Sequence, residues 1–244
     1  FCMNMKTLIR SLIIMMAAFA MNSCASLQKA AGLTELEAIL GLKDALNQGM
    51  FRSFDAFANP NQEGNAIVRF ALPEQAAAIQ STLNSLGLGS ALDKATAKFT
   101  KAMGDAVVAA KPIFTNSIKK LTIKDAFNIL VTDNMHAATD YFKRVNKPLL
   151  LDAFRPIVDS TIAAEQADLD WKKVTSVYNL IPLKKEPLEP NLTDFISARV
   201  IDGMCLIMAN EEENVRSKYS FRKTDMMQKA FGYAEQELKR RMTR

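Results

Sequence analysis

Acidic side chains and an arginine crowd one stretch of the chain at spacings that allow acid–base chemistry. Glu211, Glu212 and Glu213 are consecutive, and Arg216 follows within one helical turn. Paired carboxylates could act as general acid and base, or could capture a cation. On a helix, however, Arg216 would lie beside both Glu212 and Glu213 and could form an ion pair with either. The spacing favours a surface ion pair, or a structural clamp if the pair is buried, over catalysis.

A second group of residues could line a binding pocket. It consists of the segments Asp140-Tyr141-Phe142 and Phe154-Arg155-Pro156. Tyrosine supplies a hydroxyl, arginine supplies a planar fork for an anion, and the two phenylalanines supply apolar walls. The alternative is that both phenylalanines belong to the core, while Arg155 pairs with Asp152 or Asp159 at the surface.

From these two groups we predict one ligand-binding site. Its residues are Asp140, Tyr141, Arg155, Glu213 and Arg216.

A metal site is the next possibility. His136 and Asp140 stand four residues apart, so they would share one face of a helix, with Asp133 nearby. The chain contains only one histidine, and a stable transition-metal site needs further ligands that the sequence does not indicate. We predict no metal and no cofactor.

Signatures of familiar enzymes are missing from the sequence. It has no Gly-x-Ser-x-Gly, no His-Glu-x-x-His, no Cys-x-x-Cys and no glycine-rich phosphate loop with lysine. Cys205 lies in an apolar run, which indicates a buried thiol rather than a nucleophile. We predict no catalytic residue, although an unfamiliar hydrolase or lyase using a carboxylate, arginine and tyrosine cluster stays open.

Apolar periodicity predicts that helices position these residues in the first half of the chain. Thr34-Glu35-Leu36-Glu37 reads as a capping box that opens a helix through Met50. Pro73 suits the first turn of a helix that ends at Gly87. The pattern is helical again over residues 91–110, and Pro112 should kink this helix or start a new segment.

The same reasoning predicts the helices of the second half. Thr122 should cap one helix, and Thr132 or Asp133 should cap the next, over residues 135–145. A further helix should start at Pro148 and kink or break at Pro156, and another should begin near residue 167. Thr193 or Asn191 should cap the long helix that follows, and Thr224-Asp225 should open the last helix. The segment 182–190 holds three prolines and reads as a connection. The helix extending toward Arg216 is the most apolar and should run through the centre. We expect Gly203, in the pair Asp202-Gly203, to permit close helix packing there.

The elements together predict an all-α fold. We see no strand pair and no repeat of fixed period. We expect one helical domain over residues 34–244, with roughly eight to ten helices around the central apolar helix, some of them kinked by proline.

The N-terminal region resembles a bacterial lipoprotein signal. Lys6 and Arg10 precede an apolar run over residues 12–21 that is too short to span a bilayer, and Ser23 precedes Cys24 as in a lipobox. The resemblance implies a signal peptide over residues 1–23, a lipid anchor on Cys24 and a tether over residues 24–33. Ala25 stands where an inner-membrane retention signal would place Asp, so we expect the outer membrane, facing the periplasm.

Charge argues against nucleic acid as a partner. The chain of 244 residues has 31 Lys and Arg against 26 Asp and Glu, and these are interspersed along each segment. The run Lys239-Arg240-Arg241 reads as a solvated helix end. We predict no nucleic-acid binding.

Short motifs spread over most of the chain resemble an uncharacterised bacterial family, DUF4197, whose members are usually signal-bearing envelope proteins. The motifs that carry the resemblance are Gly41-Leu42-Lys43-Asp44-Ala45-Leu46 with Gly49, Leu86-Gly87-Leu88-Gly89, Asp125-Ala126-Phe127-Asn128-Ile129-Leu130, Ala137-Ala138-Thr139-Asp140-Tyr141-Phe142, Phe154-Arg155-Pro156-Ile157, Leu192-Thr193-Asp194-Phe195, Asp202-Gly203, Glu211-Glu212-Glu213 with Arg216, and Thr224-Asp225 before Phe231-Gly232. The chain departs from the family pattern at residues 101–105 and at Asn146. The resemblance implies a helical envelope protein and no known activity.

We therefore expect a membrane-tethered helical domain of the cell envelope that binds without catalysing a reaction. Its expected partners are the membrane, through the lipid anchor, and a small amphiphilic ligand or another envelope protein. A purely structural envelope scaffold is the remaining alternative.

Overall fold

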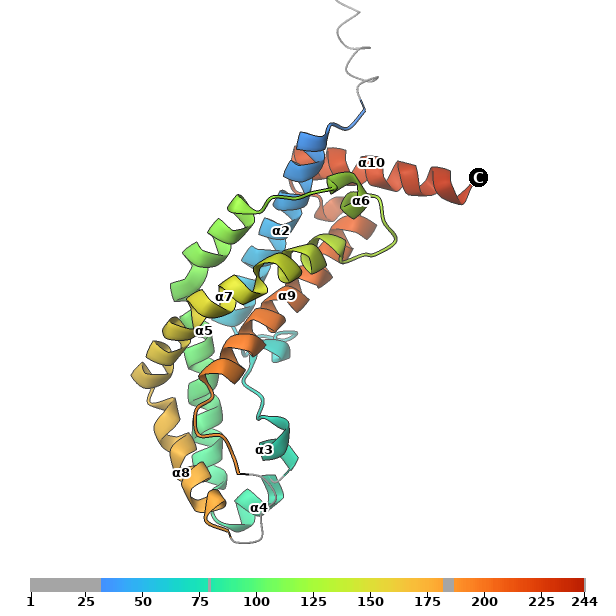
Figure 1. The fold of residues 1–244 in the computed structure, drawn as a ribbon. Helices are drawn as coiled ribbons and strands as arrows, with labels where there is room; N and C mark the ends of the chain where they lie inside the picture. Colours follow the sequence, from blue (N-terminus) through green and yellow to red (C-terminus); the bar gives the residue numbers. More distant parts are fainter. Residues whose placement is uncertain (1–31, 79, 182–186, 244) are drawn as a thin grey trace, which may run out of the picture.

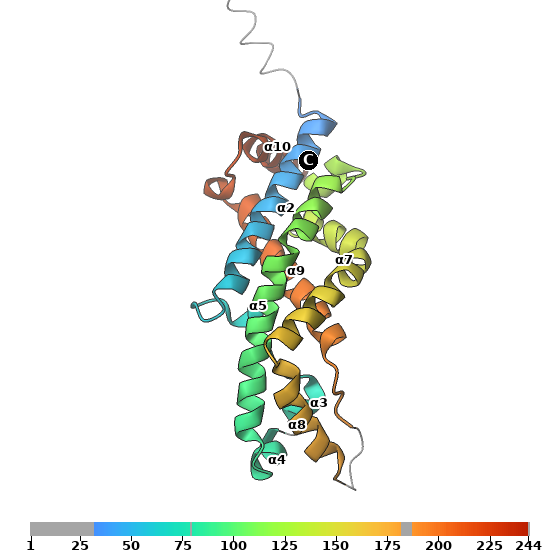
Figure 2. The same cartoon turned by 90° about the vertical axis from the view of Figure 1, so that its left-hand side faces the viewer.

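The computed structural model describes residues 32–78, 80–181 and 187–243. Its body is an elongated bundle of four long helices, α2 (Glu35–Ala58), α5 (Gly89–Lys120), α7 (Ala137–Ala164) and α9 (Thr193–Ser217) (Figures 1 and 2). Helix α2 packs on α9 and α5, while α7 packs on α5 and α9. The predicted signal peptide, Cys24 and most of the predicted tether lie outside the described residues.

Shorter helices extend the bundle at both ends. They are α3 (Glu74–Ala78), α4 (Gln80–Ser85), α6 (Ala126–Leu130), α8 (Ala167–Asn179) and α10 (Asp225–Met242), with 3-10 turns at Ala66–Val68 and Tyr219–Phe221. The start of α2 lies with α6 and α10 at one end, which we call the tether end, and α3, α4 and α8 lie at the other (Figure 1).

The described residues contain no strand, and the number of their α-helices falls within the predicted eight to ten. The prediction of a single all-α domain is confirmed, and α9 packs against α2 and α7 as the central helix. No helix among residues 32–78, 80–181 and 187–243 is both long and apolar enough to cross a membrane.

Aromatic rings join three of the long helices inside the bundle. The ring centroid of Phe114 on α5 lies 6.4 Å from that of Phe54 on α2 and 5.6 Å from that of Phe154 on α7. All three side chains are buried, and so is Phe142. Both phenylalanines of the predicted pocket are therefore core residues.

Local capping signals set several helix boundaries. Thr34 and Glu37 form the predicted capping box at the start of α2, and the Thr224 side chain accepts a hydrogen bond from the Met227 amide at the start of α10. The prediction for Thr122 is wrong, because Asp125 stands at the N-cap of α6 instead. Helix α7 begins two residues later than expected, at Ala137, and Asn134 Oδ1 accepts from the His136 amide before it.

The long helices continue through their prolines. Pro112 lies inside α5, and Pro148 and Pro156 lie inside α7, so the predicted helix start at Pro148 and break at Pro156 are wrong. A proline deprives the carbonyl four residues earlier of its helical partner. Each proline is exposed, as is the residue four positions before it, so water can satisfy that carbonyl.

Close helix contacts occur at Gly49 and Gly41, for which the sequence analysis predicted no packing role. A Cβ atom on Gly49 would lie 2.9 Å from Met208 Cα, so α2 and α9 approach closely there. A Cβ atom on Gly41 would clash with Ala230 Cβ on α10, so α2 and α10 also approach closely. At Gly203, the predicted close contact, the nearest atom would be Phe57 Cζ at 3.5 Å, an ordinary packing distance.

Candidate functional site

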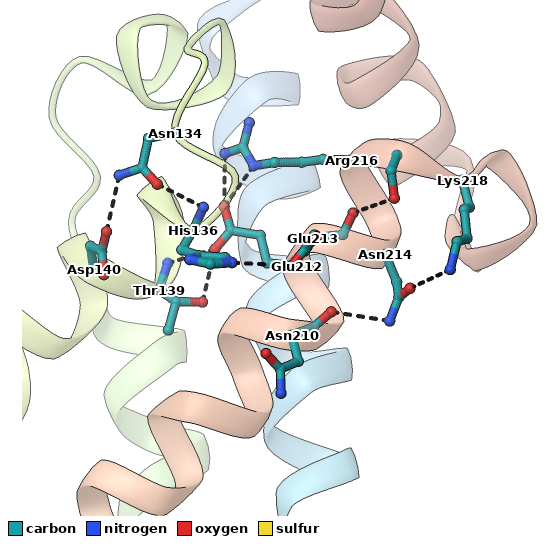
Figure 3. A network of polar contacts seen from close by, with 11 residues as sticks. Asn134, His136, Thr139, Asp140, Asn210, Glu212, Glu213, Asn214, Arg216 and Lys218 are labelled. Carbon is teal, nitrogen blue, oxygen red and sulfur yellow. Dashed lines mark hydrogen bonds and ion pairs between the residues drawn. The ribbon is translucent and has the colours of Figure 1, made fainter.

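The buried ion pair Glu212–Arg216 forms the centre of a polar network at the tether end (Figure 3). The guanidinium and carboxylate approach to 2.7 Å, and their side chains are 5% and 2% exposed. Burying two charges is costly unless their hydrogen-bonding capacity is also satisfied. The remaining partners of both groups therefore determine what the pair can do.

Glu212 holds the start of α7. Its carboxylate accepts hydrogen bonds from the amides of Ala138 and Thr139 at 3.0 and 2.8 Å, and from the Thr139 hydroxyl at 2.8 Å. Free amides and the helix dipole at a helix N-terminus favour a negative charge. Glu212 thus caps α7 from a different helix, which local sequence signals do not reveal.

Arg216 holds the end of α6. Its Nη1 donates to the Leu130 carbonyl and its Nη2 to the Ile129 carbonyl, each at 2.9 Å. Its guanidinium also lies over the Phe231 ring of α10, 5.4 Å from the centroid. Arg216 therefore joins α6, α9 and α10, and the pair is the buried clamp that the spacing allowed.

The predicted site residues Glu213 and Asp140 lie at the exposed rim of this network. Glu213 Oε2 is 3.4 Å from His136 Nε2, and the Asn134 side chain donates to Asp140. No group of three or more His, Cys, Asp or Glu side chains that could hold a metal ion occurs among the described residues.

Tyr141 lines a groove between the C-terminal half of α5 and the N-terminal half of α7. This Tyr141 groove has a volume of about 730 Å³. Its other lining residues are Ile113, Asn116, Ser117, Lys120, Leu121, Thr122, Lys124, Val145, Asn146, Leu149, Leu150 and Ala153. The Tyr141 hydroxyl donates to the Thr122 carbonyl at 2.7 Å, so it fixes the segment between α5 and α6.

Arg155 does not line this groove and lies far from Tyr141. It stands fourteen residues after Tyr141 on α7, about 21 Å along the helix axis. It forms ion pairs with Asp152 at 2.8 Å and Asp194 at 2.6 Å on the surface. The structure thus brings Arg216 and Glu213 to one network and Tyr141 to a groove, but it does not bring Arg155 to either.

Cys205 is buried in α9, as expected from its apolar surroundings. Burial raises the pKa of its thiol to about 11. The thiolate form that nucleophilic chemistry requires is therefore scarce at neutral pH.

The sequence analysis missed the cations beside Tyr141. Lys120 and Lys124 line the groove, and the Arg144 guanidinium lies 5.3 Å from the Tyr141 ring centroid. Lys119 and Lys120 end α5, where basic residues are common, so the sequence alone gives them no special meaning. Only the packing of α5 beside α7 brings these cations to Tyr141.

Comparison with known proteins gives one match. A family model described as "Protein of unknown function (DUF4197)" matches residues 32–232, which run from the residues just before α2 into α10. No curated protein and no solved structure matches the chain.

Proposed function

Because the chain belongs to the DUF4197 family, whose description names no activity, we propose its function from its own surface: a lipid-anchored envelope domain that binds a small amphiphile without catalysis. The Tyr141 groove is the proposed binding site. Cys24 is the proposed anchor, and the outer membrane facing the periplasm is the proposed location.

The observation that carries this proposal is the composition of the Tyr141 groove. Val145 and Leu149 are 44% and 69% exposed, and both lie on its wall. Its volume of about 730 Å³ lies within the range of small-molecule sites, roughly 300 to 1,000 Å³. Apolar walls with a few polar groups suit a molecule that is itself part apolar and part polar.

The arrangement of the titratable groups supports binding rather than catalysis. A hydrolase or lyase needs its acid, base and substrate-orienting groups within hydrogen-bond reach of one reacting centre. Arg155 is remote from Tyr141, and both charges of the Glu212–Arg216 pair are occupied by backbone groups of α6 and α7. The predicted carboxylate, arginine and tyrosine residues do not converge.

Native mass spectrometry tests this proposal. The sample is the chain from Ala25 onward, which retains every described helix and lacks the lipidated cysteine, purified without detergent from a bacterial host. We expect an added discrete mass that is lost on mild denaturation.

A pair of variants locates the bound molecule. Val145→Gln with Leu149→Gln should abolish the added mass, because both changes make the groove wall polar. Val177→Gln with Leu169→Gln is the matched control, since those residues are 43% and 49% exposed on α8 at the other end. A ligand-free wild-type chain, or equal loss in both variants, would contradict binding in the Tyr141 groove and favour a protein-binding scaffold, to be sought by crosslinking in the intact envelope.

A further inference from the structure

Three cations beside the Tyr141 groove lack an acidic partner within the described part of the chain. These residues, the cationic rim, are Lys120, Lys124 and Arg144. The ammonium groups of the two lysines form no ion pair or hydrogen bond with any described residue, and Arg144 contacts the Tyr141 ring without a carboxylate.

Four other lysines on the same two helices are neutralised by carboxylates. On α5, Lys98 pairs with Asp170 at 2.8 Å, and Lys101 pairs with Asp105 and Glu165. On α7, Lys143 and Lys147 both pair with Asp202. Lys94, Lys111 and Lys119 on α5 also lack an acidic partner among the described residues. What distinguishes the cationic rim is that its unpaired charges lie beside a groove with apolar walls.

Tyr141 helps to hold the rim in place. Its hydroxyl donates to the Thr122 carbonyl and lies 3.5 Å from the Lys124 amide nitrogen. The segment that carries Lys124 is thus fixed against the groove. An anion that enters between Lys120 and Lys124 would relieve their mutual repulsion.

The groove also lies near the point where the tether joins the bundle. Lys43 Nζ donates to the Lys119 carbonyl at 2.9 Å, so the end of α5 lies beside Lys43, which is about 12 Å along the axis of α2 from the first residue of that helix. Ten residues from Cys24 to Leu33 can span at most roughly 35 Å. An anchored chain would therefore keep the cationic rim close to the surface of its own membrane.

We propose that the Tyr141 groove binds an anionic phospholipid. The phosphate group lies at Lys120 and Lys124, and an acyl chain lies on Val145 and Leu149. This inference rests on the proposed function, because it assigns a head-group charge to the amphiphile bound there. The positive charge of the cationic rim suits the anionic head group of such a lipid, and the apolar wall of the groove suits its acyl chain.

Two soluble short-chain lipids test the charge requirement. Dihexanoylphosphatidylglycerol and dihexanoylphosphatidylcholine carry the same acyl chains, but only the first has a net negative head group. We expect isothermal titration of the chain from Ala25 onward to show at least fivefold tighter binding of the glycerol lipid. This preference should shrink as salt is raised from about 50 mM to 500 mM, because salt screens exposed charges.

Charge variants assign the preference to the rim. Lys120→Gln with Lys124→Gln should reduce the preference to less than about twofold while leaving the choline lipid unaffected. Arg69→Gln with Lys94→Gln is the matched control, because it removes the same charge from exposed residues without ion pairs in the described chain. The control should keep the preference, and an equal loss in both variants would overturn the proposed site.

The remaining outcomes separate this inference from the proposed function. Equal binding of both lipids, lost in the Val145→Gln and Leu149→Gln variant, would overturn the charge assignment and leave amphiphile binding intact. Absence of binding by either lipid would overturn the inference, and it would overturn the proposed function as well if native mass spectrometry also found no ligand. If inorganic phosphate bound as tightly as the glycerol lipid, the groove would be a site for free anions, and the assignment of a phospholipid ligand would be contradicted.

Discussion

At the scale of single residues, the burial of Glu212 explains how three helices meet at the tether end. Its carboxylate takes the charge of Arg216 on one side and the free amides at the start of α7 on the other. Arg216 in turn takes the carbonyls at the end of α6. Each charge compensates the other and also forms hydrogen bonds with backbone groups. Loss of either charge should therefore strongly lower the free energy of unfolding.

The variant Glu212→Gln measures this cost. It keeps the size of the side chain but leaves Arg216 buried without a counter-charge, so we expect the free energy of unfolding to fall by about 3 kcal/mol. Urea denaturation followed by circular dichroism measures the change. Glu213→Gln on the exposed neighbouring residue is the control and should change it by less than about 0.5 kcal/mol. If both variants lowered the free energy of unfolding by a similar amount, burial of the ion pair would not be the cause of the loss.

At the scale of helices, two contacts of α2 show how the bundle is assembled. Gly49 lets α2 approach α9, and the Glu37 side chain connects the start of α2 to Lys229 on α10 at 2.6 Å. One contact depends on the absence of a side chain and the other on a charge. They should therefore respond to different perturbations.

Alanine variants distinguish the tight glycine contact from an ordinary one. Gly49→Ala would place a Cβ atom 2.9 Å from Met208 Cα, so α2 and α9 must separate, and we expect a loss of about 2 kcal/mol. Gly203→Ala meets only ordinary contacts and gains helix propensity, so it should be neutral or stabilising by up to about 1 kcal/mol. Thermal unfolding compares the two variants. Equal destabilisation would contradict the close approach at Gly49.

Acid should weaken the contact between α2 and α10. Hydrogen bonds from Lys229 and from Thr34 lower the pKa of Glu37 from 4.5 to about 2. A lowered pKa stabilises the folded state above the unfolded value, and this stabilisation is lost as the pH falls from about 4.5 toward 2. Glu37→Gln should therefore have a lower melting temperature than the wild type at pH 7, with a difference that narrows between pH 5 and pH 2. Melting curves that stay equally separated over this range would contradict the role of the ionised carboxylate.

The parts of the fold that depend on neighbouring residues were predictable from the sequence. The capping box at Thr34 and the cap at Thr224 follow from short-range patterns. The helix start expected at Pro148 was wrong, because exposure of its surroundings is a tertiary property. For the same reason the sequence could not show that Glu212 caps α7 or that Lys120 and Lys124 lie beside Tyr141.

At the scale of the whole molecule, the bundle is elongated and different helices make up its two ends. The start of α2 lies at the tether end with α6 and α10, while α3, α4 and α8 lie at the opposite end (Figure 1). If Cys24 carries lipid, the tether end faces the membrane and the other end extends into the periplasm. In that case the anchor would hold the Tyr141 groove close to the membrane that supplies its proposed ligand.

The anchor is tested separately from the groove. We expect radiolabelled palmitate to be incorporated into the wild-type chain in a bacterial host, and the protein to sediment with outer membranes. Cys24→Ser should abolish labelling, and Ala25→Asp should move the protein to the inner-membrane fraction. Labelling that persists in Cys24→Ser would contradict the anchor.

The most direct test of binding in the groove is an NMR titration. Amide chemical shifts of the isotopically labelled chain from Ala25 onward are followed as dihexanoylphosphatidylglycerol is added below its micelle concentration. Binding in the Tyr141 groove predicts saturable shifts concentrated in residues 113–124 and 141–153, where α5 and α7 face each other. Shifts concentrated at α3, α4 and α8, or spread evenly over the bundle, would contradict it.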